Sequence, residues 1–172
     1  MHYFLLGPSG VGKTTLGNWL EENRQYHHLA VDRGGQTDGL TAEELIGLWN
    51  NLLPDPAPFA RKLQERAKTQ GKKGCVLTFP SVTFFVLGWI DHVADHNMLV
   101  RYLYGPKEKC IEAYLNREKR EGHPRDRAFW SRNNGNYEAM GMPVLAPYRT
   151  DVIEPNGKRL NGEEIATRLN IV

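Results

Sequence analysis

Near its start the chain carries Gly7-Pro8-Ser9-Gly10-Val11-Gly12-Lys13-Thr14, which fills every position of the GxxxxGK[ST] phosphate-loop pattern. The apolar residues 2–6 precede it as a buried strand, and residues 15–22 follow it with the pattern of a helix. Glycines let the backbone turn so that consecutive N–H groups face phosphate oxygens, and the helix adds the positive end of its dipole. The pattern therefore predicts a preformed phosphate cradle between a strand and a helix.

Three side chains of the phosphate loop have expected roles. Lys13 can reach the β- and γ-phosphates of ATP and stabilise charge on the transferring group. The Thr14 hydroxyl is placed to coordinate Mg²⁺, and Thr15 supports the helix start. The predicted nucleotide-binding residues of this stretch are Gly7, Pro8, Ser9, Gly10, Val11, Gly12, Lys13, Thr14 and Thr15. The pattern identifies a nucleotide site and leaves the phosphate acceptor open.

The composition is that of a folded globular protein. A chain of 172 residues suits one domain with its own core, and 24% charged with 40% hydrophobic residues excludes a disordered or fibrous chain. The longest strongly apolar run, residues 82–90, is well short of the roughly 20 residues that span a bilayer. No charged-then-apolar leader precedes residues 2–6. We expect one domain over residues 1–172, a cytoplasmic location and no membrane partner.

The charge is nearly balanced over the whole chain but not along it. Lys and Arg number 22 against 20 Asp and Glu, a net charge of +2, which by itself does not indicate a nucleic-acid partner. Residues 117–132 hold a local excess of arginine, which favours contact with a phosphate. A nucleic-acid partner stays open but is not favoured, and the oligomeric state is not predicted.

Strand-like and helix-like segments alternate along the chain. The expected strands are residues 2–6, 28–31, 75–79, 98–104 and 150–154, and the expected helices are 15–22, 41–51, 59–70, 82–96, 106–121, 133–140 and 162–170. Such alternation predicts an α/β fold with a five-stranded, mostly parallel sheet and helices on both faces. Right-handed crossovers then bring the carboxyl ends of all strands to one edge.

Asp32 directly follows the second expected strand, so it falls at the edge of the sheet that carries the phosphate loop. A carboxylate there can orient an acceptor hydroxyl as general base or hold Mg²⁺ through water. We therefore predict Asp32 as a catalytic and metal-site residue.

In length, element order and loop position the chain resembles the small P-loop kinases of the nucleoside-monophosphate-kinase and shikimate or gluconate kinase type. The resemblance implies a three-layer P-loop NTPase fold with strand order 2-3-1-4-5, an acceptor-binding region over about 37–70 and a short mobile lid over about 117–132. It also implies that lid arginines close over the γ-phosphate and that an arginine before the fifth strand packs against adenine. The residues concerned are Arg117, Arg125 and Arg127 in the lid, with Arg120 beside them, and Arg149 at the base.

The sequence differs from the motifs of two known families, the shikimate kinases and the GTPases. Residues 78–81 replace the glycine triplet of shikimate kinases, and residues 32–34 lack their two-aspartate signature, so we expect an acceptor other than shikimate. Residues 32–35 match the DxxG of GTPases, but they come only 18 residues after Thr14 and no NKxD follows. This spacing disfavours a GTPase switch.

The sequence thus favours an ATP- and Mg²⁺-dependent phosphotransferase that moves the γ-phosphate to a hydroxyl or phosphate of a small-molecule acceptor. Two alternatives remain open at this point. One is a nucleotide or polynucleotide 5′-hydroxyl kinase on the same scaffold, and the other is a regulatory P-loop ATPase that has no acceptor.

Overall fold

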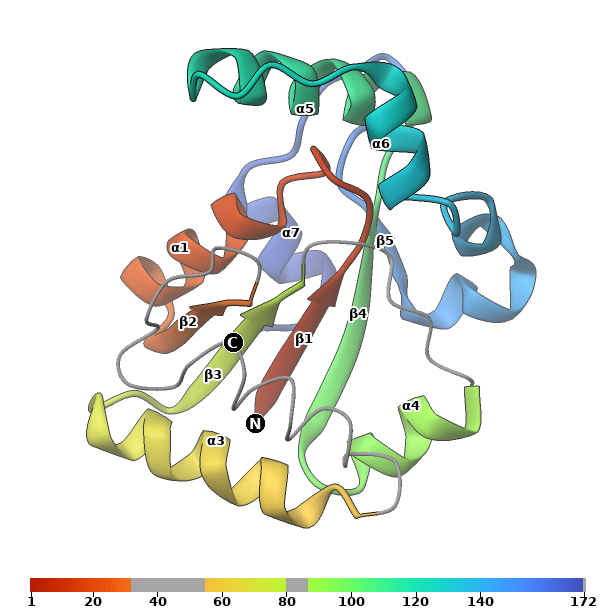
Figure 1. Cartoon of the computed structure of the whole chain (residues 1–172). Helices are drawn as coiled ribbons and strands as arrows, with labels where there is room; N and C mark the ends of the chain where they lie inside the picture. The colour runs from red at the N-terminus through yellow and green to blue at the C-terminus, as the bar shows by residue number, and fades with distance from the viewer. Residues whose placement is uncertain (32–54, 80–86, 172) are drawn as a thin grey trace.

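The computed structural model describes residues 1–31, 55–79 and 87–171, and its centre is one parallel sheet. The five strands are β1 (His2–Leu6), β2 (Tyr26–Ala30), β3 (Gly74–Thr78), β4 (Met98–Tyr104) and β5 (Arg149–Asp151). They lie in the order β2-β3-β1-β4-β5, and each neighbouring pair is parallel (Figure 1). The predicted strand order 2-3-1-4-5 is confirmed. The order places β1, and hence the phosphate loop, in the middle of the sheet.

Helices cover both faces of the sheet, because successive side chains of a buried strand point to opposite faces. From β1, Tyr3 and Leu5 join the core that packs on one side, and Phe4 and Leu6 join the other. The first core includes residues of α1 (Lys13–Asn23), α5 (Lys107–Arg120), α6 (Arg127–Asn133) and α7 (Gly162–Arg168), and the second includes residues of α3 (Ala57–Thr69) and α4 (Leu87–Ala94). The predicted three-layer arrangement is therefore present.

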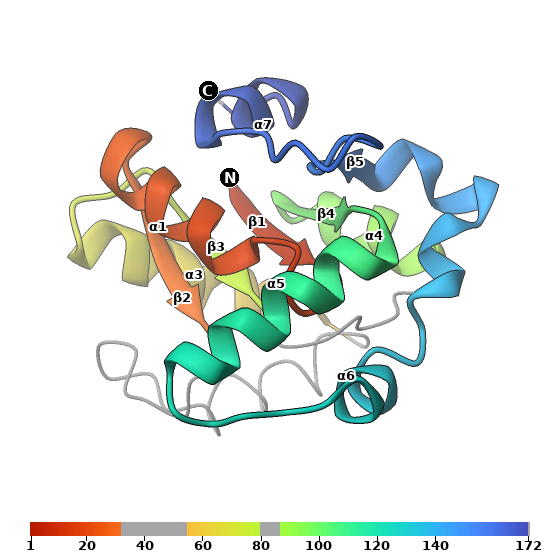
Figure 2. The same ribbon diagram turned by 90° about the horizontal axis from the view of Figure 1, so that it is seen from above.

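Two of the helices belong to the end of the sheet where the phosphate loop lies. α5 follows the carboxyl end of β4, and both α5 and α6 lie at the carboxyl ends of the strands (Figures 1 and 2). Figure 2 shows α5 crossing in front of the sheet from the end of β4 toward the side of β2, after which the chain returns to α6. The segment that the sequence predicts to be a lid is thus beside the loop.

The structure differs from the sequence prediction after α5. Residues 133–140 are expected as a helix, but the helix of this region is α6 (Arg127–Asn133), and residues 138–141 (η1) and 143–148 (η2) are 3-10 turns. Asp126 explains the difference, since its carboxylate accepts a hydrogen bond of 2.7 Å from Phe129 N and caps the helix. The predicted helix over residues 133–140 was wrong because the helix of this region begins directly after the Asp126 cap and ends at Asn133.

The remaining boundaries shift by a few residues. β2 begins and ends earlier than the expected 28–31, and β5 is shorter than the expected 150–154. Asp32 and the expected helix over residues 41–51 lie outside the described residues, and the expected acceptor region 37–70 is described only from residue 55 on. Within residues 1–31, 55–79 and 87–171, no helix combines the length and the apolar character that a membrane crossing requires.

Candidate nucleotide site

The phosphate loop leaves β1 in a conformation that needs glycine. Gly7 has φ +143° and Gly10 has φ +87°, both in a region that side-chain-bearing residues rarely adopt. A Cβ atom would lie 2.4 Å from Leu103 O if added to Gly7, and 2.0 Å from Cys110 O if added to Gly10. These two glycines therefore let the loop lie directly against the end of β4 and the first turns of α5.

Lys13 holds the first part of the loop from inside. It is the first residue of α1, its side chain is only 7% exposed, and its Nζ donates hydrogen bonds of 2.8 Å to Gly7 O and 3.1 Å to Pro8 O. These bonds to the loop carbonyls compensate part of the desolvation of a buried ammonium. The loop thus holds a positive charge at the place where the pattern predicts phosphate.

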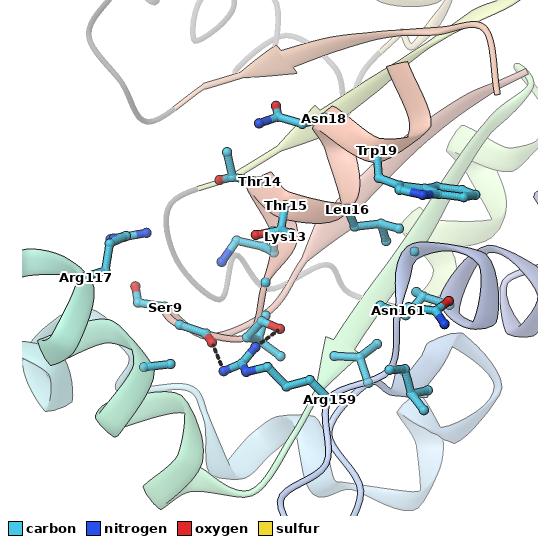
Figure 3. A pocket seen from close by; sticks show the side chains of 18 of the residues that line it. Ser9, Lys13, Thr14, Thr15, Leu16, Asn18, Trp19, Arg117, Arg159 and Asn161 are labelled. Atoms are coloured by element: carbon cyan, nitrogen blue, oxygen red, sulfur yellow. Dashed lines mark hydrogen bonds between the residues drawn. The ribbon is translucent and has the colours of Figure 1, made fainter. Parts of the chain in front are cut away.

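Arg159 holds the second part of the loop from the other side. Its guanidinium donates to Gly10 O at 2.8 Å and to Val11 O at 3.2 Å, as the dashed lines of Figure 3 show. In a planar trans peptide the N–H points away from the C=O. The two bonds therefore turn the N–H groups of Val11 and Gly12 away from Arg159, and the Val11 N–H donates to Pro8 O at 3.2 Å within the loop.

A cavity of about 510 Å³ lies on the loop. Its walls are the loop itself, one side of α1, the second half of α5, and the chain from β5 to α7 (Figure 3). The residues that line it are Ser9, Gly10, Val11, Gly12, Lys13, Thr14, Thr15, Leu16, Asn18, Trp19, Ala113, Arg117, Arg120, Val152, Arg159, Leu160, Asn161, Gly162 and Ile165. This lining contains a lysine and three arginines and, among the described residues, no Asp or Glu. The cavity suits an anion with an apolar or aromatic part.

Thr14 is the described residue that could hold a magnesium ion. It follows Lys13 on α1, is partly exposed and lines the cavity, and a hydroxyl oxygen is a ligand that Mg²⁺ accepts. Within the described ranges, no three His, Cys, Asp or Glu side chains gather into a metal site of their own. The donor set fits a Mg²⁺ that is bound mainly through nucleotide phosphates and water.

Of the arginines predicted in the lid, Arg117 lies at the cavity, with Arg120 one turn further along α5. The Arg117 side chain extends from α5 toward the side of the loop that carries Lys13 and Thr14 (Figure 3). Its NH2 group donates to Glu118 Oε1 at 2.7 Å, and its guanidinium lies 5.3 Å from the centre of the Tyr114 ring. Arg117 is therefore already oriented by its neighbours at the edge of the site.

The two other lid arginines have partners away from the cavity. Arg127 forms an ion pair with Glu108 at the start of α5, and Arg125 lies 4.5 Å from the centre of the Phe129 ring. Neither is among the described residues that line the cavity. The arrangement brings Arg117 to the loop and leaves Arg125 and Arg127 outside it.

Arg149 occupies a different place from the one that the resemblance implies. It is the first residue of β5, its guanidinium lies 4.8 Å from the centre of the Tyr104 ring, and it donates to Met140 O at 3.3 Å. It does not line the cavity, whereas Arg159 does. Sequence reasoning missed Arg159, and its one signal is that it follows the Asn156-Gly157 turn, which returns the chain toward the loop.

Both cysteines are buried, and one lies under the loop. Cys110 is on α5, and burial raises the pKa of its thiol to about 11. Burial likewise raises the pKa of the Cys75 thiol, on β3, to about 12. A neutral buried thiol is a poor nucleophile, so both residues belong to the core rather than to the chemistry.

Comparison with known proteins agrees with this architecture. No family model matches the sequence. An uncharacterized protein of Bacillus subtilis (strain 168), YqaC, is 30% identical over 114 residues, or 66% of this chain. The matched part spans about half of that protein, 54% of its length.

Two solved structures resemble nearly the whole chain. The tunicamycin resistance protein of Deinococcus radiodurans has a TM-score of 0.54 and 18% identity, covering 99% of this chain and 96% of its own. A sugar kinase of Janibacter sp. HTCC2649 has a TM-score of 0.50 and 18% identity, covering 99% and 95%. With the strand order and the loop geometry, these similarities show that the chain has the fold of the small P-loop kinases.

Proposed function

We propose that this protein is an ATP- and Mg²⁺-dependent phosphotransferase that moves the γ-phosphate to a small-molecule acceptor. The observation that carries the proposal is the cationic cavity on a complete phosphate loop, with Lys13 buried at its base and Arg117 at its rim. The kinase fold and the name of the similar sugar kinase support the same reaction class. Phosphoryl transfer is catalysed mainly by positioning and charge stabilisation, which is what these residues offer.

Each group around the cavity has a role in this reaction. The loop N–H groups bind the β- and γ-phosphates, and Lys13 neutralises charge that develops between them. Thr14 would help to hold Mg²⁺, which would offset the charge of the phosphates when bound. Arg117 stabilises the equatorial oxygens of the transferring phosphoryl group from the opposite side.

The base of the nucleotide fits the other half of the cavity. Trp19 on α1, Leu160 and Ile165 give that half an aromatic and apolar wall, which suits a planar base. Arg159 takes the place at the base side that the resemblance gives to Arg149. The pocket thereby accommodates phosphate at the loop and base near α7.

Asp32 is proposed as the group that receives the acceptor proton. It comes two residues after β2 ends, and it lies outside the described residues. A carboxylate in this position orients an acceptor hydroxyl toward the γ-phosphate. The Asp32→Asn variant is expected to keep its ATP affinity and to lose turnover by roughly two orders of magnitude or more.

The experiment that tests the proposal measures transfer from ATP labelled at the γ-phosphate, with Mg²⁺, to a panel of acceptors. The panel contains sugars, sugar acids, polyols, aminoglycosides, tunicamycin, nucleosides, nucleotides and 5′-hydroxyl oligonucleotides, and hydrolysis is followed in parallel. A labelled product that disappears without Mg²⁺ supports the proposal and gives the acceptor class.

Other outcomes distinguish the alternatives. Transfer only to oligonucleotides, weakened steeply by salt, would identify a polynucleotide kinase. Slow hydrolysis that no acceptor accelerates and that Asp32→Asn leaves unchanged would contradict the phosphotransferase and favour a regulatory ATPase.

A further inference from the structure

The phosphate loop is also held by a helix that the mechanism does not use. Trp130, in the middle of α6, and Asn134, at its C-terminal cap, both contact the main chain of Ser9. Trp130 Nε1 donates to Ser9 O at 2.9 Å, and Asn134 Oδ1 accepts from Ser9 N at 2.8 Å. Trp130 is 1% exposed and Asn134 is 3% exposed. Asn134 Nδ2 donates in turn to Trp130 O at 2.8 Å. Both main-chain polar groups of Ser9 are thus fixed by buried side chains.

Asn134 and Lys13 bind opposite sides of one peptide group, the one between Pro8 and Ser9. The N–H of Ser9 and the C=O of Pro8 belong to the same planar unit and point in opposite directions. Asn134 binds the N–H side, and Lys13 Nζ donates to the C=O side at 3.1 Å. A rotation of this peptide would remove both bonds together. Asn134 therefore sets the orientation of a carbonyl that holds the catalytic lysine.

The contact with Trp130 fixes the next peptide group. Because Trp130 binds the C=O of Ser9, the N–H of Gly10 must point away from α6. Gly10 lines the cavity, so Trp130 orients a peptide group of the cavity wall. α6 therefore determines the orientation of two successive peptides in the loop.

We propose that Trp130 and Asn134 are positioning residues of the nucleotide site, and that α6 is a fixed support of the phosphate loop rather than part of a lid that moves away from it. The inference rests on the proposed function, since it assigns the purpose of these contacts to nucleotide binding. A buried asparagine is costly unless its groups are hydrogen-bonded, and here they bind the loop and the α6 main chain. Segment motion, where it occurs, is then confined to the part before α6.

Two variants and one control test this inference. Asn134→Ala removes the acceptor of the Ser9 N–H, Trp130→Phe removes the indole N–H together with part of the buried ring, and Tyr137→Phe serves as control. Tyr137 belongs to the same cluster, 5.9 Å from Trp130 between ring centres, but its hydroxyl donates to Gly105 O at 2.7 Å and not to the loop. Trp130→Phe and Tyr137→Phe each lose one side-chain hydrogen bond and Asn134→Ala loses two, so all three variants lose some stability.

The readouts are the Kd for MgADP, the thermal midpoint and the hydrogen-exchange rate of the Ser9 amide. We expect Asn134→Ala to weaken MgADP binding about tenfold and Trp130→Phe about threefold, with Tyr137→Phe within twofold of the wild type. Exchange at Ser9 should accelerate at least about tenfold in Asn134→Ala alone. A purely structural role would lower the thermal midpoint in all three variants without changing their Kd, which would overturn the inference.

The same titration separates this inference from the proposed function. A wild-type protein that binds no MgADP would overturn both. A wild-type protein that binds MgADP, together with an Asn134→Ala variant that binds it equally well, would overturn only the role given to α6.

Discussion

The phosphate loop and the arginine-rich segment over residues 117–132 border the same site, but they are held in different ways. In the loop, side chains donate to main-chain carbonyls, as Lys13 does from the loop itself and as Trp130 and Arg159 do from distant parts of the chain. In the segment, arginine side chains pair with nearby carboxylates and rings, as Arg127 does with Glu108. The first arrangement fixes a backbone shape, and the second only places charges. We therefore expect the loop to dominate binding and the arginines to contribute individually.

Removal of Lys13 is expected to give the largest effect and so tests the loop side of the comparison. Lys13→Ala removes the charge at the base of the cavity and the donor to Gly7 O and Pro8 O, so phosphoryl transfer should fall at least about a thousandfold. The assay is transfer to the acceptor found with the panel. Lys109→Ala, an exposed lysine paired with Glu112, is the control and should keep normal activity. Phosphoryl transfer by Lys13→Ala at the wild-type rate would show that Lys13 takes no part in the reaction.

Arg117 and Arg127 form a matched pair that tests the segment side. Arg117 lines the cavity, and Arg127 does not, so Arg117→Ala should lower kcat/KM about 10- to 100-fold while Arg127→Ala stays within about twofold. Steady-state kinetics with ATP as the varied substrate measures both. Equal losses in the two variants would mean that residues 117–132 close as one lid, as the resemblance to the small P-loop kinases implies.

The two parts of the site also differ in what the sequence can predict. Gly10, Lys13 and Thr14 belong to one local pattern whose spacing fixes their geometry, the parallel sheet follows from the alternation of strands and helices, and the strand order follows from the resemblance to the small P-loop kinases. Arg159, Trp130 and Asn134 act on the loop from 121 to 149 residues away, and no local spacing records such contacts. Their residue types are common on any surface or core. What sequence reasoning missed is therefore the support of the loop, not the loop.

The variants Arg159→Ala and Arg149→Ala test which of the two arginines contributes to nucleotide binding. Arg159→Ala should weaken MgADP binding about fivefold, because two loop carbonyls lose their donor and the cavity loses a wall. Arg149→Ala should leave the Kd unchanged, although loss of its contact with the Tyr104 ring will lower stability slightly. Calorimetric titration with MgADP measures the Kd of both variants. Weaker binding by Arg149→Ala, with an unchanged Kd for Arg159→Ala, would support the contact between Arg149 and the base that the resemblance implies.

The smallest effect on nucleotide binding is expected from His2, which does not line the cavity. Its titration is expected to change the stability of the fold. The ring is 2% exposed, and its Nδ1 accepts from Cys75 N at 3.0 Å. Burial, and then the nearby N-terminal ammonium, lower the pKa of His2 from 6.5 to about 4. Between these values the unfolded chain binds a proton that the folded chain does not. Stability should therefore fall as pH drops from 6.5 to 4 and stay level, for this group, above 6.5.

The loss assigned to His2 is on the order of 3 kcal/mol at the acid end of that range. Urea unfolding at pH 7 and pH 4.5 measures it against His2→Asn, whose amide oxygen can accept the same bond without titrating. The variant should show a clearly smaller loss of stability on acidification. An equal loss in both proteins would assign the acid sensitivity to other groups.

The measurement that tests the whole account most directly is a titration of the isotopically labelled protein with MgADP, followed through its backbone amide resonances. The account predicts that the shifts concentrate in residues 10–15, at Arg117 and in residues 159–162, with little change at Arg127 and Arg149. Unchanged amide resonances in residues 10–15, or changes concentrated around Arg149, would contradict this account.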